Sequence, residues 1–452
     1  MQIGSVILAA GMSKRMKSAV PKVIHPILGK PILAYAIATA QAVSSLPPVV
    51  VVGHASELVM QNINAGVEYA FQKEQLGTAH AVMMAKDCLK GKVDQVMVIS
   101  ADMPLIRKET LEMLIDSQLS NDGPMSMVSI VDDESRGFGR IIRNEAGDAL
   151  AIIEEKVADA QQLMIKEYNA GIYCFKSDWL WNALETVKKS AVGEYYLTDL
   201  LQIAVEAHQP VKVITLPDAE EAIGINNRVH LAEVEKIMRR RINEAFMLDG
   251  VSMIDPERVY IEASVEIGQD TVIYPETYIR GKSKIGKNCE IGPGTIIDDS
   301  IVGDDCRILK SVMERAELED HVEMGPFCHL RSGAYLASHV HMGNFGEVKK
   351  SYLGEGTKMG HFSYIGDAQI GNNVNIGAGT ITCNYDGQKK NKTVIGDGTF
   401  IGSDTMLVAP LTIGKNAVTG AGAVVTKDVG DGEKVVGVPA HVIENKKEED
   451  HS

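Results

Sequence analysis

The chain has 452 residues, more than one ordinary hydrophobic core accommodates, which indicates two or three domains. Hydrophobic residues make up 45% and charged residues 23%, a balance typical of globular proteins and not of disordered or membrane-embedded ones. The formal net charge of −15 predicts an acidic surface, which argues against nucleic acid as the main partner. No stretch approaches the roughly 18 apolar residues that a membrane span needs, so we expect no membrane partner.

The N-terminus and the cysteines indicate where the protein works. The first apolar run, SVILAA, has no basic segment before it and no small-residue cleavage site after it, so it predicts a buried strand and not a signal peptide. The six cysteines are scattered without a CxxC pair or a zinc signature, which is typical of reduced thiols in the cytosol. We therefore expect a cytoplasmic protein.

Before residue 250, short apolar runs alternate with helical patterns. The apolar runs are SVILAAG, PPVVVVG, QVMVISAD and GIYCF, and the clearest helical patterns are PILAYAIATAQAV and KETLEMLIDSQL. Strands that alternate with helices predict a mostly parallel sheet covered on both faces, so we expect a Rossmann-like α/β domain over residues 1–228. Residues 229–248 form a helical pattern without Gly or Pro, and we interpret 229–250 as a linker helix.

After residue 250 a period of six replaces the helical pattern. Between residues 261 and 413, aliphatic residues recur at six-residue steps, often followed by Gly or another small residue. Such hexapeptides are typical of a parallel β-helix, in which the aliphatic residue points inward and three flat faces make one coil. The alternative, a Gly-rich β sandwich, has strands of period two and no fixed six-residue phase. We expect a β-helix over 251–442, an extruded loop at 383–393 and a charged, disordered tail at 443–452.

A candidate phosphate-binding turn follows the first strand. In LAAGMSKRM (8–16), Gly11 lets the backbone approach a ligand closely, and exposed N–H groups in such a turn bind phosphate oxygens. Lys14 and Arg15 add positive charge, and Lys22 follows in VPKVIHP. A Gly-containing turn after a strand is weak on its own, and a plain turn explains it equally well.

The combination of motifs is more specific. LAAGMSKRM followed by PK, QLGTAHA, ADMPL, GFGR, IIEEK and YNAG resembles the sugar-nucleotide pyrophosphorylase family along residues 1–228. Together with the hexapeptides and the NYDG loop, the chain resembles over nearly its whole length the bacterial bifunctional N-acetylglucosamine-1-phosphate uridyltransferases and glucosamine-1-phosphate acetyltransferases. The resemblance implies a left-handed β-helix, a homotrimer with active sites between subunits, Mg²⁺ as cofactor, and UTP and acetyl-CoA as co-substrates.

The resemblance also implies roles for residues of the first domain. Gln72, Gly77 and Thr78 would read the uracil, Asp102 and Asn227 would hold Mg²⁺, and Arg15 and Lys22 would act in catalysis by facing the triphosphate. Such cations and a metal suit the reaction, because two anions must meet when a sugar phosphate attacks a nucleoside triphosphate. The implied contacts to the nucleotide and the sugar are Leu8, Ala9, Ala10, Gly11, Lys22, Gln72, Gly77, Thr78, Ser100, Ala101, Asp102, Gly139, Glu154, Asn169 and Asn227.

Each of these residues also has a structural explanation. Asp102 could cap a turn, Lys22 and Glu154 could be solvated surface charges, and the pair Asn226–Asn227 could be a helix N-cap.

Two departures from the family pattern leave the sugar preference open. Ala101 stands where Gly commonly precedes the metal-binding Asp, and Val157 replaces the usual Asp of IVE-x-KDA.

Acetyl transfer to a sugar amine needs a base, and His suits this role near neutral pH. Of the central histidines, the family motifs select His361 in GHFSYIGD as the base and Glu347 as the carboxylate that orients it; His361 could also be a corner residue, and we expect His339 and His341 to be structural. The resemblance implies amino-sugar phosphate contacts at Arg331, Lys349, Tyr364, Asn375 and Lys390. It implies acetyl-CoA contacts at Ala378, Asn384, Tyr385, Ser403, Ala421 and Gly437, the last at a position where relatives often carry Arg.

Three functions compete. The first is the bifunctional enzyme that acetylates glucosamine 1-phosphate and then couples N-acetylglucosamine 1-phosphate to UTP. The second is a nucleotidyltransferase with a regulatory β-helix, as in ADP-glucose pyrophosphorylases, which His361, Glu347 and the NYDG loop disfavour. The third is a non-catalytic subunit that resembles translation-factor exchange subunits, which Lys22, Asp102 and Asn227 disfavour.

Overall fold

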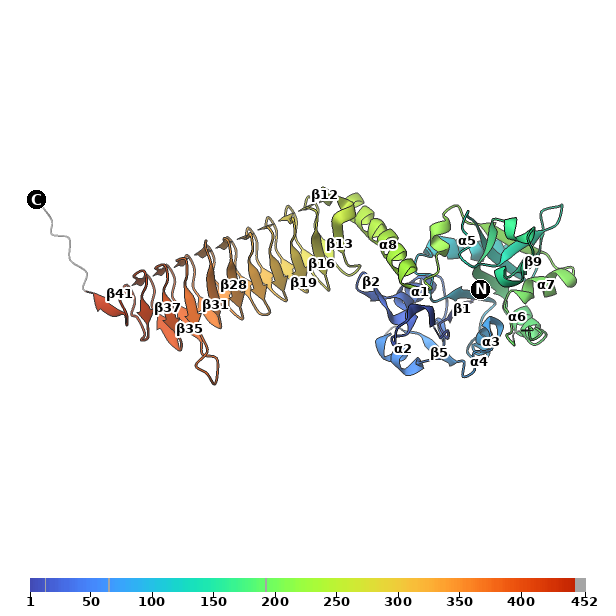
Figure 1. Cartoon of the computed structure of the whole chain (residues 1–452), viewed down its shortest axis with the longest axis horizontal. Coiled ribbons are helices and arrows are strands. Elements are labelled where there is room, and N and C mark those ends of the chain that lie inside the picture. The colour runs from blue at the N-terminus through green and yellow to red at the C-terminus, as the bar shows by residue number, and fades with distance from the viewer. Residues whose placement is uncertain (13, 64–65, 192, 444–452) are drawn as a thin grey trace, which may run out of the picture. The chain divides into compact units, whose positions relative to one another are not determined.

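A computed structural model of the protein describes residues 1–12, 14–63, 66–191 and 193–443. The chain forms two compact units, Met1–Met238 and the part from Arg239 onward, whose elements are labelled in Figure 1. None of the helices in the described ranges combines the length and the apolar composition needed to cross a bilayer. The tail predicted for 443–452 lies, from residue 444, outside the described residues.

The first unit is built on a mostly parallel sheet, as predicted. The contacts of β1 with β4 and β6, of β4 with β5 and of β7 with β11 are parallel, whereas β10 runs antiparallel between β6 and β7. In the described residues its strands are β11 (Val211–Thr215), β7 (Met125–Val131), β10 (Glu167–Lys176), β6 (Gln95–Ser100), β1 (Ile3–Leu8), β4 (Val49–Val52) and β5 (Glu68–Phe71), with β8 (Arg140–Arg143) and β9 (Ala149–Ile153) as an antiparallel pair beside β10.

Helices cover both faces of this sheet. Alternate residues of one strand enter two different cores: Val96 and Val98 pack with residues of α3 and α6, and Met97 and Ile99 pack with residues of α1 and α5. The α-helices are α1 (Ile32–Gln41), α2 (Ser56–Asn62), α3 (Thr78–Met83), α4 (Lys86–Leu89), α5 (Lys108–Leu119), α6 (Ser177–Leu184) and α7 (Asp199–Glu206). Short elements complete the unit: η1 (Lys14–Met16), η2 (Lys22–Ile24), β2 (Pro26–Ile27), β3 (Lys30–Pro31), η3 (Glu155–Val157), η4 (Gln162–Met164) and η5 (Ala219–Ala222).

The second unit is a β-helix with three sheets, which we call face 1, face 2 and face 3 in chain order. Within the described part of the chain, face 1 comprises β12 (Ser252–Met253), β15 (Val272–Ile273), β18 (Glu290–Ile291), β21 (Arg307–Ile308), β24 (Glu323–Met324), β27 (His341–Met342), β30 (Lys358–Met359), β33 (Asn375–Ile376), β36 (Phe400–Ile401), β39 (Val418–Thr419), β41 (Lys434–Val436) and β42 (His441–Ile443). Face 2 comprises β13 (Val259–Ile261), β16 (Thr277–Arg280), β19 (Ile296–Asp298), β22 (Val312–Glu314), β25 (His329–Arg331), β28 (Gly346–Lys349), β31 (Ser363–Gly366), β34 (Ile381–Cys383), β37 (Met406–Val408) and β40 (Val424–Val425). Face 3 comprises β14 (Glu266–Ile267), β17 (Lys284–Ile285), β20 (Ile301–Val302), β23 (Glu317–Leu318), β26 (Tyr335–Leu336), β29 (Tyr352–Leu353), β32 (Ala368–Ile370), β35 (Thr393–Ile395) and β38 (Leu411–Ile413).

The period of six predicted this architecture, because one aliphatic residue from each face points into the interior. Ile273, Ile279 and Ile285, one from each face of a coil, are all buried in a single apolar column. Coil length varies: the pairing of Ile279 with Ile297 spans 18 residues, whereas that of Ile285 with Val302 spans 17. These shorter coils account for the breaks in the phase of the repeat.

The helix α8 (Arg228–Leu248) provides side chains for the first coil of the β-helix. Ile242 and Phe246 pack against the interior of the β-helix, and Asn243 Nδ2 donates to the carbonyl oxygens of Pro256 (2.8 Å) and Val259 (3.1 Å). The guanidinium of Arg239 lies 4.5 Å from the ring centroid of Tyr260. The second half of α8 therefore covers apolar residues that the first coil would otherwise leave open to water.

Candidate active sites

The first unit has a cavity of about 490 Å³ at the carboxyl ends of its parallel strands. Ligands of open α/β sheets bind at this edge, where the strand ends turn into loops. The predicted residues Leu8, Ala9, Ala10, Gly11, Arg15, Lys22, Gln72, Gly77, Thr78, Ser100 and Asp102 line the cavity. Its lining does not include the predicted residues Ala101, Gly139, Glu154, Asn169 and Asn227.

An ion pair lies in the wall of this cavity. Lys22 Nζ, at the start of η2, is 2.5 Å from Asp102 Oδ2, just beyond the end of β6. The two side chains are 14% and 24% exposed, so the pair is shielded from bulk water but open to a ligand. An ammonium group and a carboxylate, the kinds of group that bind phosphate oxygens and divalent metals, therefore lie side by side.

The Asn pair after η5 lies close to Asp102 but is already engaged. Ile225 N–H donates to the carbonyl oxygen of Asp102 (2.9 Å), and Asn226 Oδ1 accepts from Arg15 Nη2 (2.8 Å). Asn227 Oδ1 accepts from the N–H of His230 (2.9 Å), the third residue of α8. Asn227 is thus the N-cap of this helix, the structural alternative considered above, and a second lone pair of its oxygen is left for a metal ion.

The strand-to-helix turn before α3 is closely packed. Gly77 has φ +104°, and a Cβ there would lie 2.4 Å from the carbonyl oxygen of Tyr195, so only glycine fits. Gln72 is buried, and its Nε2 lies 3.0 Å from the Gly77 carbonyl oxygen. The Thr78 hydroxyl accepts from the N–H of Leu197 (2.9 Å), so its oxygen supports the turn.

The three residues predicted for the sugar half lie together on the β8–β9–β10 side of the unit. Asn169 N–H donates to the Gly139 carbonyl oxygen (2.8 Å), and a Cβ on Gly139 would lie 3.7 Å from Glu154 Oε1. The register of β10 shifts between Asn169 and Tyr173, and the Asn169 amide bonds to Tyr173 Oη (2.6 Å) across this irregularity. Irregular pairing of this kind re-aims side chains near sites.

Several residues at these sites were missed by sequence reasoning. Gln75, Glu194 and Tyr196 line the cavity, and Glu155 binds both the Ser135 hydroxyl and Arg140 (3.4 Å). Glu194 and Tyr196 follow no recognised motif, and only the folded chain brings them to the cavity.

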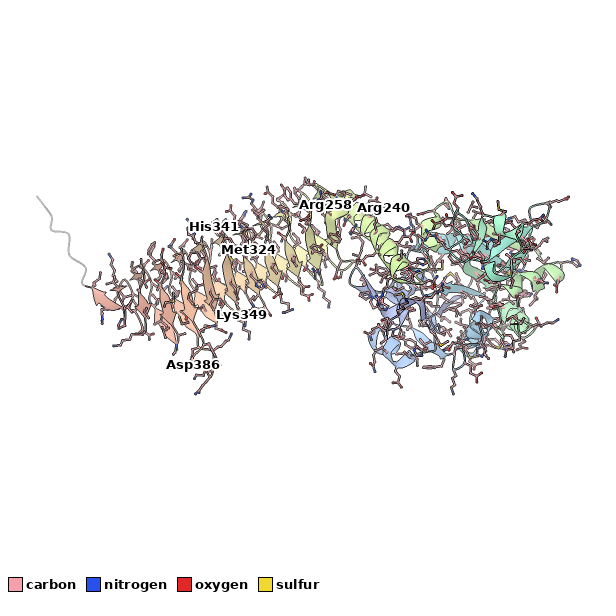
Figure 2. The ribbon with its side chains drawn as sticks, viewed as in Figure 1. Arg240, Arg258, Met324, His341, Lys349 and Asp386 are labelled. Carbon is pink, nitrogen blue, oxygen red and sulfur yellow. The ribbon has the colours of Figure 1, made fainter. Side chains whose placement is uncertain are left out.

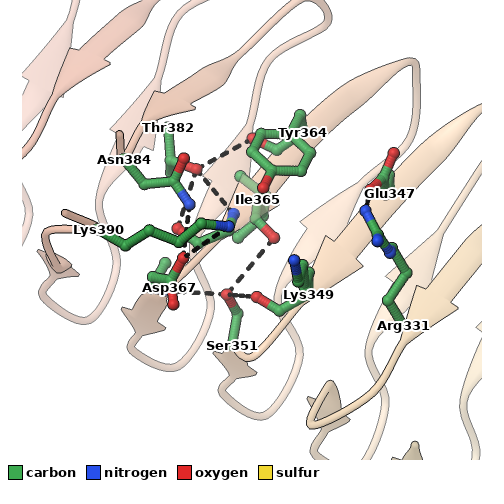
Figure 3. A network of polar contacts seen from close by, with 12 residues as sticks. Arg331, Glu347, Lys349, Ser351, Tyr364, Ile365, Asp367, Thr382, Asn384 and Lys390 are labelled. Carbon is green, nitrogen blue, oxygen red and sulfur yellow. Dashed lines mark hydrogen bonds and ion pairs between the residues drawn. The ribbon is translucent and has the colours of Figure 1, made fainter. Parts of the chain in front are cut away.

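In the second unit, four predicted residues project from face 2. Arg331 on β25 pairs with Lys349 on β28, and Glu347 on β28 pairs with Tyr364 on β31. The guanidinium of Arg331 lies 3.0 Å from Glu347 Oε1. Figure 3 shows these two side chains next to each other. Both side chains are more than one-third exposed, so the pair contributes little to stability and remains available to a ligand.

The extruded loop adds a third cation. Lys390 and Arg331 together lower the pKa of Lys349, with Lys390 as the larger cause. The three side chains are labelled in Figure 3. Arg331 faces Glu347, and Lys390 Nζ lies 4.0 Å from Asp367 Oδ2, so two carboxylates balance the three cations in part, and an anion bound at Lys349 would relieve the remaining repulsion. Figure 2 shows Lys349 and Asp386 along one edge of the β-helix and His341 along the other.

The loop itself is a built structure. Asp386 accepts from the N–H groups of Gln388 (2.9 Å) and Lys389 (2.8 Å) and from Asn391 Nδ2 (2.9 Å), and these bonds lower the pKa of Asp386 to about 2. Asn384 Nδ2 donates to Asp367 Oδ2 (2.6 Å), which ties the base of the loop to the preceding coil.

Five predicted residues form a column along the corner between faces 1 and 2. The pairings of Asn375 with Phe400 and of Phe400 with Val418 place equivalent positions of successive coils above one another. The N–H of Asp404 donates to the carbonyl oxygen of Ala378, and the N–H of Gly422 donates to that of Ser403, as this stacking requires. The column consists of His361, Ala378, Ser403, Ala421 and Gly437.

One chain does not bring all predicted groups together. Glu347 pairs with Tyr364 on β31, whereas His361 lies in the corner before this strand, and the carboxylate of Glu347 engages Arg331. His361 lies at the start of face 2, the cations lie at its end, and Asn375 is on face 1. The role of Glu347 toward His361 remains a prediction.

Comparisons with known proteins agree with both units. The nucleotidyl transferase family model matches residues 4–220, and the bacterial transferase hexapeptide model matches residues 264–299 and 392–427. Three relatives named bifunctional protein GlmU align along almost the full length. That of Caldanaerobacter subterraneus is 45% identical over 95% of this chain and 94% of its own. That of Thermosipho africanus is 46% identical over 97% and 95%, and that of a Geobacillus species is 46% identical over 94% and 93%. Identity at this level along both units shows that the chain belongs to the family of the bifunctional protein GlmU.

Proposed function

We propose that the protein acetylates glucosamine 1-phosphate with acetyl-CoA and then couples the N-acetylglucosamine 1-phosphate to UTP, releasing UDP-N-acetylglucosamine and pyrophosphate. The observation that carries this proposal is that one chain holds both the Lys22–Asp102 ion pair in the cavity of its first unit and a cation cluster, Arg331, Lys349 and Lys390, on its β-helix. A nucleotidyltransferase with a merely regulatory β-helix would have no need for both a cluster of three cations and a corner column that holds His361.

In uridylyl transfer, a phosphate oxygen of the sugar attacks the α-phosphorus of UTP and pyrophosphate leaves. Asp102 and Asn227 would hold Mg²⁺, because a carboxylate and an amide oxygen are the hard ligands that this ion prefers. The metal would supply charge neutralisation at the phosphates. Lys22 and Arg15 hold the triphosphate against the turn at Gly11, so that nucleophile and leaving group stay in line.

In acetyl transfer, the amine of the sugar attacks the thioester carbonyl of acetyl-CoA, the amide bond forms, and the C–S bond breaks. His361 takes the proton that the nitrogen loses, and the departing thiolate is protonated. Arg331, Lys349 and Lys390 hold the phosphate of the sugar. The corner column provides a continuous surface for the extended cofactor.

We further propose a homotrimer in the cytoplasm. His361 and the cation cluster lie at opposite ends of face 2 in one chain, so a neighbouring chain that lends its corner to this face would complete the site. All six cysteines are unpaired, which suits a reducing compartment where UTP and acetyl-CoA are available.

The proposal is tested by assaying the two half-reactions separately. Thiol release with acetyl-CoA should require glucosamine 1-phosphate and proceed without UTP or Mg²⁺. Pyrophosphate release should require UTP, N-acetylglucosamine 1-phosphate and Mg²⁺ and proceed without acetyl-CoA. A protein that releases pyrophosphate but no thiol is the nucleotidyltransferase with a regulatory β-helix.

Gly77→Ala should lower kcat/KM for UTP by about 10²-fold, because the added Cβ displaces the turn against Tyr195 by the order of an ångström. Acetyl transfer should stay at the wild-type rate. Gly91→Ala is the matched control, since Gly91 also has a positive φ (+74°) but open space around it. Equal losses in the two variants would show that backbone strain, and not the fit at Tyr195, explains the effect.

Lys390→Gln should shift to higher pH the increase in KM for glucosamine 1-phosphate that occurs on the alkaline side. Lys349 must be protonated to hold the phosphate, and its lowered pKa makes KM rise earlier with pH than an ordinary Lys would. Removing the larger cause of that lowering returns the pKa toward its usual value, although KM at neutral pH increases because a cation is lost. KM measured from pH 7 to 10 checks this, with Lys389→Gln on the same loop as control; an unmoved limb contradicts the assignment.

A further inference from the structure

Gln72 is held by two contacts that both use the nitrogen of its amide. The side chain is 3% exposed and lines the cavity of the first unit. Its Nε2 lies 3.0 Å from the carbonyl oxygen of Gly77 and 3.0 Å from Nδ1 of His80. A carbonyl oxygen only accepts, so the nitrogen end of the amide must face Gly77, and the opposite orientation would place two oxygens against each other.

His80 completes this arrangement. It is the third residue of α3 and accepts the second amide hydrogen of Gln72 through Nδ1, which requires the tautomer with the proton on Nε2. The Gly77 carbonyl oxygen also accepts from the N–H of Ala81 (3.1 Å), so it is fully used. Both hydrogens of the Gln72 amide are therefore committed to the protein.

One atom of the amide is left for a ligand. In the described part of the chain no hydrogen bond ends on Gln72 Oε1, and this oxygen is not among the buried polar atoms sealed from solvent without a partner. At the cavity wall Gln72 thus presents an acceptor and no donor. The N–H of Gly77 makes none of the backbone bonds of the turn and lies beside it as a donor.

We propose that His80 is a positioning residue that selects the base of the nucleotide, by fixing the Gln72 amide so that only its oxygen faces the ligand. A base with an N–H at ring position 3, such as uracil, donates to this oxygen. Cytosine has an unprotonated nitrogen at the same position, which would face Oε1 as a second acceptor and leave both unpaired. The inference rests on the proposed use of UTP and adds the reason why CTP is rejected.

His80 matters because Gly77 alone holds only one of the two hydrogens. With both partners present, a rotated amide would place its oxygen against two acceptors, Gly77 O and His80 Nδ1. Without His80, a rotated amide oxygen would face only one acceptor, Gly77 O, so rotation costs less free energy. The amide can then turn its nitrogen toward cytosine. We expect a loss of discrimination of about tenfold, the upper range for one buried hydrogen bond.

The test measures kcat/KM of the full-length protein for UTP, CTP and 3-methyl-UTP, in which a methyl group replaces the N3 hydrogen. The wild type should use UTP and discriminate strongly against the other two. His80→Leu should lower the UTP-to-CTP ratio by about tenfold. His80→Asn should keep the ratio within about twofold, because Asn Oδ1 can accept where Nδ1 did. His54→Leu, a change at an exposed histidine that does not line the cavity, should have no effect.

The outcomes separate cleanly. An unchanged ratio in His80→Leu, or an equal loss in His80→Asn and His80→Leu, overturns the role of His80. Wild-type protein that uses CTP or 3-methyl-UTP as well as UTP also overturns it, even if His80→Leu fails to fold. Acetyl transfer by the same preparations reports that the variants are folded. A wild type that turns over none of the three nucleotides contradicts the proposed function instead.

Discussion

Asp102→Asn lowers uridylyl transfer by about 10²–10³-fold in our account, and leaves acetyl transfer within about twofold of the wild type. The carboxylate of Asp102 is the only charged metal ligand that we propose, and a neutral amide binds Mg²⁺ less well. The change also removes the charge that pairs with Lys22 at 2.5 Å, so Lys22 loses its fixed position at the phosphates. Loss of one preorganised electrostatic contact typically costs this much in rate.

The measurement is the initial rate of pyrophosphate release at several Mg²⁺ concentrations. The loss should shrink as Mg²⁺ increases, because weaker metal binding is part of the defect. Asp122→Asn is the matched control, since Asp122 is exposed and precedes β7 at the opposite edge of the sheet. Equal loss of both activities in Asp102→Asn would indicate misfolding and contradict the separation of the two sites.

His361→Ala should lower acetyl transfer by about 10²–10⁴-fold, the usual contribution of a positioned general base. The KM for acetyl-CoA should change little, because the other members of the corner column, such as Ala378 and Ser403, remain in place. Uridylyl transfer should be unaffected. In a plot of kcat/KM for acetyl transfer against pH, the decrease on the acid side should become flatter in this variant. This applies at pH values where protonation of the substrate amine does not itself limit the rate.

His341→Ala provides the control for this variant. His341 is half-exposed on face 1, where its Nδ1 lies 3.0 Å from Glu323 Oε2. Its loss should leave both rates near the wild type. A wild-type acetylation rate in His361→Ala would remove His361 from the mechanism and direct attention to the remaining histidines, starting with His329.

The sequence predicted the fold well because both units repeat their core pattern. Ile273 and Ile279 occupy the interior of the β-helix as the six-residue period requires, and α5 matches the pattern of KETLEMLIDSQL. The antiparallel direction of β10 was not predicted, because an apolar run such as GIYCF is the same in either direction. Strand direction depends on the connections and not on the run itself.

Side-chain partners were harder to predict than backbone elements. The motifs identified Lys22 and Asp102 separately. Their ion pair forms only because the fold brings the start of η2 next to the residues that follow β6. The role of Glu347 toward His361 stays a prediction, but the contact of Glu347 with Arg331 was not predicted, since in-register stacking of the coils decides which neighbours meet. Aligning the coils in the sequence could have revealed the corner column. Its members recur at intervals of about one coil, except where the extruded loop lengthens the interval.

The central claim is that one chain acetylates the amino sugar phosphate and then transfers the uridylyl group of UTP to the product, releasing pyrophosphate. The most direct measurement supplies the protein with glucosamine 1-phosphate, UTP, Mg²⁺ and acetyl-CoA labelled in the acetyl group, and follows the label and pyrophosphate over time. Our account predicts labelled UDP-N-acetylglucosamine in a one-to-one ratio with pyrophosphate, with a lag while labelled N-acetylglucosamine 1-phosphate accumulates. Pyrophosphate release at the same rate without acetyl-CoA, with an unacetylated UDP-sugar as product, would contradict it.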